Sequence, residues 1–265
     1  KNVIIIGLPG SIDSSKYLNL MCKRAIVTGA SSGIGRALAL KLASAGYRVG
    51  VLARREELLL ALQSQYPGQI EISVSDVSRP ESCQRGINSL IEKLGGLDLC
   101  VANAGIGCPN PEFVLAPELA TVDVNIVGFV ATVEAAVRQF RKQGGGHLVG
   151  ISSVAALRGN ARSPAYNASK AFELNYLEGL HTSLARFNIA VTDIRPGFVE
   201  TEMTAQNKRM FWVAAPEVAA AQIYCAIVRK KRVAYVTARW RWPAAVMRLI
   251  PYSLWRRSQL KYLNQ

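Results

Sequence analysis

Two side chains in the middle of the chain have the types and the spacing that proton transfer requires. Tyr166 is followed four positions later by Lys170, and of the nine tyrosines it alone has a lysine at that distance. On a helix this spacing places both side chains on one face, where the ammonium favours the ionised phenol. A phenol in that setting can donate a proton to a carbonyl oxygen or accept one from an alcohol. Ser153, thirteen residues before Tyr166, could hold the oxygen of such a substrate.

A glycine-rich turn near the start of the chain has the composition of a phosphate-binding loop. The segment Thr28–Gly35 reads Thr-Gly-Ala-Ser-Ser-Gly-Ile-Gly and lies where a predicted strand passes into a predicted helix. Gly29 permits the tight turn, Gly33 a close approach of backbone to a pyrophosphate, and Gly35 close packing of helix on sheet. Free N–H groups at the helix start would then hold the phosphates. An ordinary strand–helix turn also uses glycines and stays open as the alternative.

The end of the second predicted strand indicates which dinucleotide would bind. Sites for NAD place an Asp or Glu there to bond the ribose 2′-hydroxyl. Here Ala53 is followed by Arg54 and Arg55, whose guanidinium groups could pair with a 2′-phosphate. The sequence therefore favours NADP(H) over NAD(H), unless the two arginines merely begin a surface helix.

Short apolar strands alternate with longer helical patterns from Lys23 onward. We expect strands over 25–28, 49–52, 70–74, 97–102, 147–152, 189–194 and 233–237. The helices between them include 34–45, 119–142, 165–187 and 216–228. Strands joined in this way require right-handed crossovers and a sheet covered on both faces. The fold class is therefore predicted to be α/β, a doubly wound parallel sheet of about seven strands in a single domain over residues 21–237.

Residues 1–20 and 238–265 are expected to lie outside that domain, as an N-terminal extension and a basic, Trp/Arg-rich C-terminal tail. Ten Lys or Arg and no acid lie between Arg229 and Gln265, in a chain of net charge +14. Such a tail either forms a solvated basic face or contacts an anionic partner. Its interleaved Trp, Tyr and Arg fit peripheral membrane contact about as well as packing on the domain or a partner subunit. Nucleic acid is least favoured, because no recognition motif accompanies the charge.

Composition excludes several other classes of protein. With 50% apolar and 19% charged residues in 265, the chain is neither disordered nor fibrous. Five cysteines without a C-x-x-C pair predict no zinc site and no disulfide framework, and they favour the reducing cytoplasm. The two histidines, His147 and His181, lack partners at ligand spacing, so no metal site is expected. We find no apolar run of the ~18 residues that a membrane span needs.

Further short motifs, in a fixed order, make the chain resemble the classical short-chain dehydrogenase/reductase (SDR) family over about residues 23–235. They are Thr28–Gly35, Asp76-Val77, Asn103-Ala104-Gly105, Asn125, Ser153, Tyr166–Lys170 and Pro196–Thr201. The resemblance implies a Rossmann-type oxidoreductase that transfers hydride between NADP(H) and a small-molecule carbonyl/alcohol substrate. By analogy it also implies a homodimer or homotetramer.

The resemblance implies a role for each matching position. Tyr166 would be the general acid/base, Lys170 would bond the nicotinamide ribose, and Ser153 would orient the substrate carbonyl. Asn125 would anchor a water that connects Lys170 to solvent. Arg54 would meet the 2′-phosphate. The cofactor would also be contacted by Gly29, Ser31, Ser32, Gly33, Ile34, Gly35, Asp76, Val77, Asn103, Ala104, Gly105, Pro196, Gly197, Val199 and Thr201.

The segment 202–215 is the expected substrate loop, and its Met203, Met210, Phe211 and Trp212 predict a hydrophobic pocket. Packing of these side chains on the tail or on a neighbouring subunit is nearly as well supported. A second function remains open: a non-catalytic module that senses NADP(H) and docks to a membrane or nucleic acid through its tail. Retention of the Ser, Tyr and Lys set favours the enzyme, since a sensor needs no proton donor.

Overall fold

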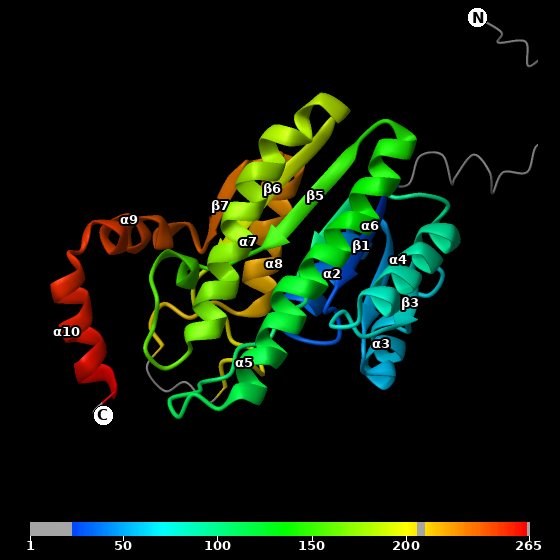
Figure 1. The fold of residues 1–265 in the computed structure, drawn as a ribbon. Coiled ribbons are helices and arrows are strands. Elements are labelled where there is room, and N and C mark those ends of the chain that lie inside the picture. The colour runs from blue at the N-terminus through cyan, green and yellow to red at the C-terminus, as the bar shows by residue number, and fades with distance from the viewer. Residues whose placement is uncertain (1–22, 206–209, 264–265) are drawn as a thin grey trace, which may run out of the picture.

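A single parallel sheet forms the centre of the computed structural model, which describes residues 23–205 and 210–263. The strand order is β3-β2-β1-β4-β5-β6-β7 (Figure 1). The strands are β1 (Arg24–Thr28), β2 (Arg48–Ala53), β3 (Ile70–Val74), β4 (Leu99–Ala102), β5 (Gly146–Ile151), β6 (Ile189–Pro196) and β7 (Val233–Val236). All neighbouring strands pair in parallel. This order is that of a Rossmann-type sheet with one added strand, so the predicted fold class is confirmed.

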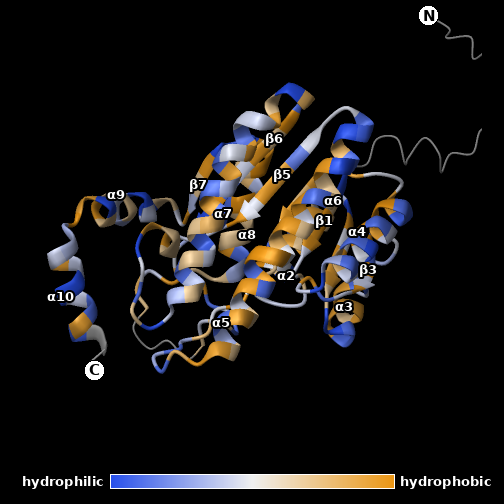
Figure 2. Ribbon diagram, in the orientation of Figure 1, coloured by the Kyte–Doolittle hydropathy of each residue, from blue (hydrophilic) through white to orange (hydrophobic). Residues whose placement is uncertain are grey.

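Helices cover both faces of the sheet and enclose two apolar cores. The first core contains α2 (Gly33–Ser44), α3 (Glu56–Gln63) and α8 (Pro216–Val228). The second contains α4 (Pro80–Leu94), α6 (Gly128–Gln143) and α7 (Pro164–Ser183). The central strands are mostly apolar because both of their faces are buried. Figure 2 shows the same pattern, with orange on the central strands and blue toward the outer ends of the helices.

One long helical segment in front of the sheet differs from its prediction. It begins at Leu115 rather than Leu119 and consists of α5 (Leu115–Val122), a π-helical turn (Asp123–Val127) and α6. By length and composition this segment could cross a membrane, so the expectation that no run reaches that length was wrong. More than half of its most apolar window is buried inside the fold, as in the core helix of a globular protein.

The C-terminal segment forms two helices, α9 (Arg241–Leu249) and α10 (Tyr252–Leu263), separated at Pro251. Figure 1 shows them leaving the sheet beyond β7, with α10 turned back along the side of the molecule. Trp255 on α10 donates its indole N–H to the carbonyl of Gly159 at 2.9 Å, and Gln259 accepts from the amide of Ala161 at 3.1 Å. The tail is therefore docked on the loop before α7. The extension predicted for residues 1–20 lies outside the described residues.

Candidate active site

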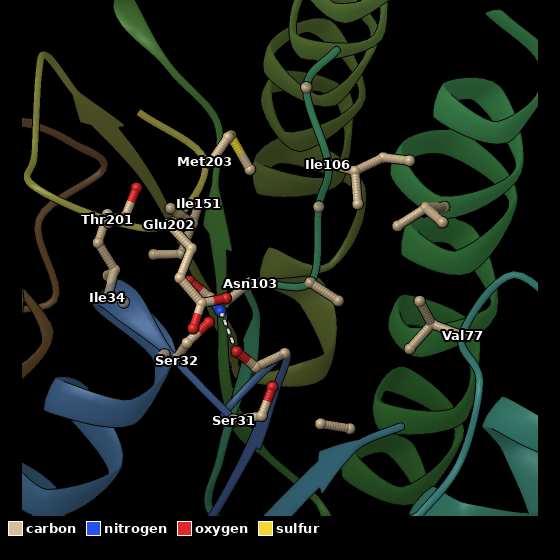
Figure 3. Close-up of a pocket in the computed structure, with 18 of the residues that line it drawn as sticks. Ser31, Ser32, Ile34, Val77, Asn103, Ile106, Ile151, Thr201, Glu202 and Met203 are labelled. Carbon is tan, nitrogen blue, oxygen red and sulfur yellow. Dashed lines mark hydrogen bonds between the residues drawn. The ribbon is translucent and has the colours of Figure 1, made fainter. Parts of the chain in front are cut away.

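A cavity of about 560 Å³ opens at the carboxyl ends of the strands, where ligands bind in doubly wound folds. Figure 3 shows Ser31, Ser32 and Ile34 from the turn after β1 on one side and Val77 and Ile106 on the other. Thr201, Glu202 and Met203 reach over it from the segment after β6. The cavity thus lies between the first strand–helix turn and the predicted substrate loop.

The turn after β1 comes very close to the loop after β4. Gly29 has a φ of +68°, and a Cβ there would lie 2.7 Å from the Cα of Ala104. The side-chain amide of Asn103 donates to the carbonyls of Thr28 (2.9 Å) and Gly29 (3.2 Å). Only a glycine meets both requirements at position 29. Asn103 therefore braces the turn that shapes the floor of the cavity.

The first turn of α2 keeps backbone donors directed at the cavity. Ser32 is its N-cap residue but does not cap the helix with its side chain. Instead, Arg55 donates to the hydroxyls of Ser31 (3.0 and 3.2 Å) and Ser32 (2.8 Å). Arg55 also forms an ion pair with Glu202 at 2.8 Å. Amides at a helix start together with a guanidinium make a site for an anion.

The two arginines after β2 differ in their surroundings, although both line the cavity. The Arg54 side chain is 66% exposed and approaches Asp76 only at 3.9 Å, whereas Arg55 is fixed by three polar side chains. Asp76 accepts from the amide (3.0 Å) and hydroxyl (2.7 Å) of Ser78. Burial opposes ionisation of Asp76, but these bonds and Arg54 lower its pKa below the ordinary value. Arg54 is thus the freer of the two cations.

Ser153 and its neighbour Ser152 have different hydrogen-bond partners. The Ser152 hydroxyl donates to the buried carboxylate of Asp193 at 2.5 Å, and Arg195 holds the second oxygen of Asp193 at 2.6 Å. The Ser153 hydroxyl accepts from the amide of Ala155 at 3.1 Å and donates to the carbonyl of Pro196 at a long 3.4 Å. Ser153 is therefore the serine that can turn its hydrogen toward a ligand.

Tyr166 lies in the first turn of α7, which begins at Pro164 in the favoured first position. Its ring edge packs against Gly107, where a Cβ would lie 2.9 Å from the Cδ2 atom of the ring. The sulfur of Met203 is 3.4 Å from the same point. The absence of a side chain at Gly107 thus makes room for the ring between the loop after β4 and the substrate loop.

Lys170 lies one turn after Tyr166 and is buried, with 5% of its surface exposed. Its ammonium donates to the carbonyl of Ile151 at 3.0 Å and to both carboxylate oxygens of Glu173, at 2.8 and 2.9 Å. Burial disfavours the charged amine, but the Glu173 carboxylate and other nearby groups hold the pKa of Lys170 above its ordinary value. The ammonium is therefore charged at neutral pH.

Asn125 is the one predicted catalytic or cofactor-binding residue that does not line the cavity. It is fully buried in the π-helical turn, where its side chain accepts from the amide of Ile106 (2.8 Å) and donates to its carbonyl (2.8 Å). It also donates to the hydroxyl of Ser169 at 2.9 Å. A Cβ on Gly105 would lie 3.4 Å from both Asn125 Oδ1 and Lys170 Nζ. Asn125 thus stands behind the cavity wall, on the side of Lys170.

The segment after β6 is held in place by the C-terminal tail. Trp240 is buried and packs against Phe198, Phe211 and Trp212, with ring centroids 5.1 to 5.9 Å away. A Cβ on Gly197 would lie only 2.1 Å from this indole. Of the four apolar loop residues in the prediction, Met203 lines the cavity and Met210 does not, while Phe211 and Trp212 pack on the tail. The prediction of an apolar pocket and its alternative, packing on the tail, thus each describe part of the loop.

Apart from Asn125, the structure brings every predicted catalytic and cofactor-binding residue to the cavity. Sequence reasoning missed Glu173, Glu202, Gly107 and Trp240. Glu173 had a local signal, since an acid three residues after Lys170 on a helix lies on the same face. Glu202 and Trp240 had none, because their partners are distant in sequence. Among the described residues, no group of three potential metal ligands occurs, and the four described cysteines are free.

The geometry agrees with what comparisons with known proteins show. The family model for short chain dehydrogenases matches residues 23–211. An oxidoreductase of Myxococcus xanthus (strain DK1622) is 42% identical over 190 residues, which are 70% of this chain and 75% of that protein. An oxidoreductase of Mycobacterium tuberculosis is 33% identical over 245 residues, 89% of this chain and 96% of its own.

Solved structures share the fold over most of its length. A short-chain type dehydrogenase/reductase from Mycobacterium marinum has a TM-score of 0.75 at 27% identity, covering 82% of this chain and 94% of that one. A 3-ketoacyl-(acyl-carrier-protein) reductase from Brucella melitensis, complexed with NADH, has a TM-score of 0.75 at 24% identity, covering 80% and 95%, and shows the fold alone. The sheet and cavity define a Rossmann-type oxidoreductase. The chain belongs to the short-chain dehydrogenase/reductase family, which confirms the resemblance.

Proposed function

We propose that this protein transfers hydride reversibly between NADP(H) and a carbonyl/alcohol substrate, with Tyr166 as the general acid/base. The observation that carries this proposal is the meeting of Ser153, Tyr166 and Lys170 in one cavity with the glycine turn. When bound, the nicotinamide ring supplies or accepts the hydride. The chain's own residues must then hold the substrate oxygen and move one proton.

The proposed proton path begins at the Tyr166 hydroxyl, which donates to the carbonyl oxygen during reduction and accepts from the alcohol during oxidation. Ser153 would give up its long bond to Pro196 and hold that oxygen. Lys170 would keep a positive charge one helical turn from the phenol, fixed by Ile151 and Glu173. Asn125 would hold a water behind Lys170, through which the proton is replaced.

The cavity fits a dinucleotide phosphate in both shape and charge. The close approach of Gly29 to Ala104 leaves bare backbone at the turn, and no acid occurs in the first turn of α2 as the structure describes it. NADP(H) is favoured over NAD(H) because β2 ends in Ala53 without a carboxylate and both arginines reach the cavity. The exposed Arg54 is the cation available to a 2′-phosphate.

The proposed substrate is a hydrophobic carbonyl or alcohol. Met203 and Ile106 line the cavity, and Trp240 packs against Gly197, which lines it too. Apolar side chains of this kind gain free energy by burying an apolar ligand.

We also propose a homodimer or homotetramer. Phe113, Val114, Leu115 and Leu119 form an exposed apolar group at the start of α5, next to α7. Exposed apolar groups of this kind mark contact surfaces. Sedimentation velocity of the protein would test it: a monomer at micromolar concentration would contradict this part of the proposal.

The experiment that tests the function compares the wild type with Tyr166→Phe. The wild type should oxidise NADPH in the presence of hydrophobic carbonyl compounds. The variant should lose turnover by ~10² or more, because the proton donor is removed, yet bind NADPH with nearly unchanged affinity. Lys142→Ala, an exposed change at the far end of α6, is the matched control. Retained turnover in Tyr166→Phe would refute the proton-donor role.

A further inference from the structure

Helix α9 carries apolar side chains on the face that points away from the protein. Trp242, Val246 and Leu249 are 66%, 59% and 82% exposed. Their spacing of four and three residues places them on one face of the helix. The opposite face is the packed one, since Ala244 is fully buried and Met247 is partly buried. Packing within the chain therefore leaves this α9 stripe (Trp242, Val246 and Leu249) uncovered.

Cations border the stripe. Arg241 and Arg248 lie seven residues apart on α9, beside Trp242 and Leu249, and both are exposed. The tail has four further exposed cations: Arg239 in the turn before α9, and Arg256, Arg257 and Lys261 on α10. After Glu217 the chain contains no acidic residue. Figure 2 shows blue and orange alternating along α9, apart from the main body of the protein.

The charges decide between the possible occupants of this stripe. A two-fold contact through α9 would bring Arg241 and Arg248 of two copies together, with no acid in the tail to neutralise them. A nucleic acid would meet the cations but would leave three apolar side chains without an apolar partner. An anionic bilayer suits both the apolar stripe and the cations, since its acyl boundary accepts Trp, Val and Leu while its headgroups attract Arg.

We propose that α9 lies in the surface of an anionic lipid membrane, with the α9 stripe inserted at the headgroup boundary and Arg241 and Arg248 among the headgroups. This inference goes beyond the proposed hydride transfer and does not depend on it. Tyr252, which is 74% exposed directly after α9, extends the apolar surface with a side chain suited to the interface. Trp240, the residue just before α9, belongs to the wall of the substrate loop. The helix proposed to contact the membrane therefore begins directly after a residue that packs against the substrate loop.

Vesicle co-sedimentation of the full chain tests the proposal. The wild type should sediment with phosphatidylcholine vesicles that contain phosphatidylglycerol, but not with phosphatidylcholine alone, and binding should weaken at high salt. Replacing the stripe by serine (Trp242→Ser, Val246→Ser and Leu249→Ser) should weaken binding by about tenfold or more. Arg241→Glu with Arg248→Glu should weaken it by a similar factor.

Two matched variants control for total exposed apolar surface and total charge. Leu60→Ser, Val218→Ser and Val228→Ser together remove three exposed apolar side chains elsewhere, and Arg229→Glu with Lys231→Glu makes the same charge change outside α9. Both should bind like the wild type. Failure to bind anionic vesicles, or equal binding by the stripe variant, would overturn the proposal. A change of oligomeric state in the stripe variant would instead identify a subunit interface. Binding needs no turnover, so it remains testable if hydride transfer fails.

Discussion

Lys170 and Glu173 form a buried ion pair on one face of α7, with the ammonium 2.8 and 2.9 Å from the two carboxylate oxygens. Both side chains are almost completely removed from solvent, at 6% and 1% exposure. A buried ammonium without a counter-charge loses its proton more easily. Burial raises the pKa of Glu173 to about 7, so above that pH its carboxylate supplies the counter-charge for Lys170.

Glu173→Gln is expected to make turnover fail at alkaline pH. In the wild type the pKa of Lys170 is raised, so its charge persists above the ordinary range of lysine. Without the carboxylate, burial dominates and Lys170 loses its proton at lower pH, so turnover should fall by about tenfold or more there. The pH profile of kcat tests this, and Glu173→Asp should restore much of the wild-type profile. A Glu173→Gln profile that coincides with the wild type, in a folded protein, would disprove the role.

Reversing the charge of Arg54 should change coenzyme preference. Arg54→Asp is expected to weaken NADPH binding by about tenfold to a hundredfold, because its carboxylate would repel a 2′-phosphate, while NADH binding changes little. Fluorescence titration of both coenzymes measures the ratio. Arg138→Asp, on the exposed surface of α6, is the control. An unchanged ratio in Arg54→Asp would contradict the preference for NADP(H).

Removing the Glu202 carboxylate that pairs with Arg55 should strengthen NADPH binding, whereas Arg54→Asp weakens it. In the structure Glu202 neutralises a guanidinium at the start of α2. Glu202→Gln removes that competing anion, so NADPH is expected to bind severalfold more tightly, in the range of an exposed ion pair. The same titration checks this, and weaker binding would indicate that Glu202 itself contacts the coenzyme favourably.

Trp240 should matter for both stability and substrate choice. Trp240→Ala would leave a cavity against Phe198, Phe211 and Gly197 and is expected to destabilise the protein by about 3 kcal/mol or more. Trp240→Phe keeps a ring and removes an indole N–H that has no hydrogen-bond partner in the described structure, so it should cost much less. Urea unfolding measures both variants. KM should rise more for bulky carbonyl substrates than for small ones in Trp240→Ala.

Protonation of the buried His147 should lower the free energy of unfolding in mild acid. Burial, with a contribution from Lys230, lowers its pKa from 6.5 to about 4, and its ring pairs with the hydroxyl of Thr192 at 2.8 Å. Because the folded pKa lies below the unfolded one, this stability is complete above pH ~6.5 and is lost as the pH falls toward about 4, to a total of about 3 kcal/mol. His147→Gln should flatten this dependence in urea unfolding, whereas the exposed His181→Gln should not.

Local patterns predicted most of the fold and the centre of the site. The strands and the spacings around Tyr166 involve neighbouring residues, so periodicity and motif order were sufficient. The helix that contains Asn125 was predicted as regular, because no residue type marks a π-helical turn. Contacts such as Gly197 with Trp240 join distant segments, and only the folded chain brings them together. The prediction that Arg54 meets a phosphate stays a prediction, and the sequence had no signal for the contacts that hold its neighbour Arg55 at the start of α2.

The π-helical turn between α5 and α6 directs Asn125 into the interior of the protein. Such a turn holds one residue more than a regular helix would at the same place, and here it directs Asn125 inward toward Ile106 and Ser169. Deleting Asn125 itself would let the turn close into a regular helix, with α5 and α6 keeping their directions. An aliphatic neighbour would then occupy the place of Asn125. The helix would remain, but the loop after β4 would lose the polar anchor beneath the cavity.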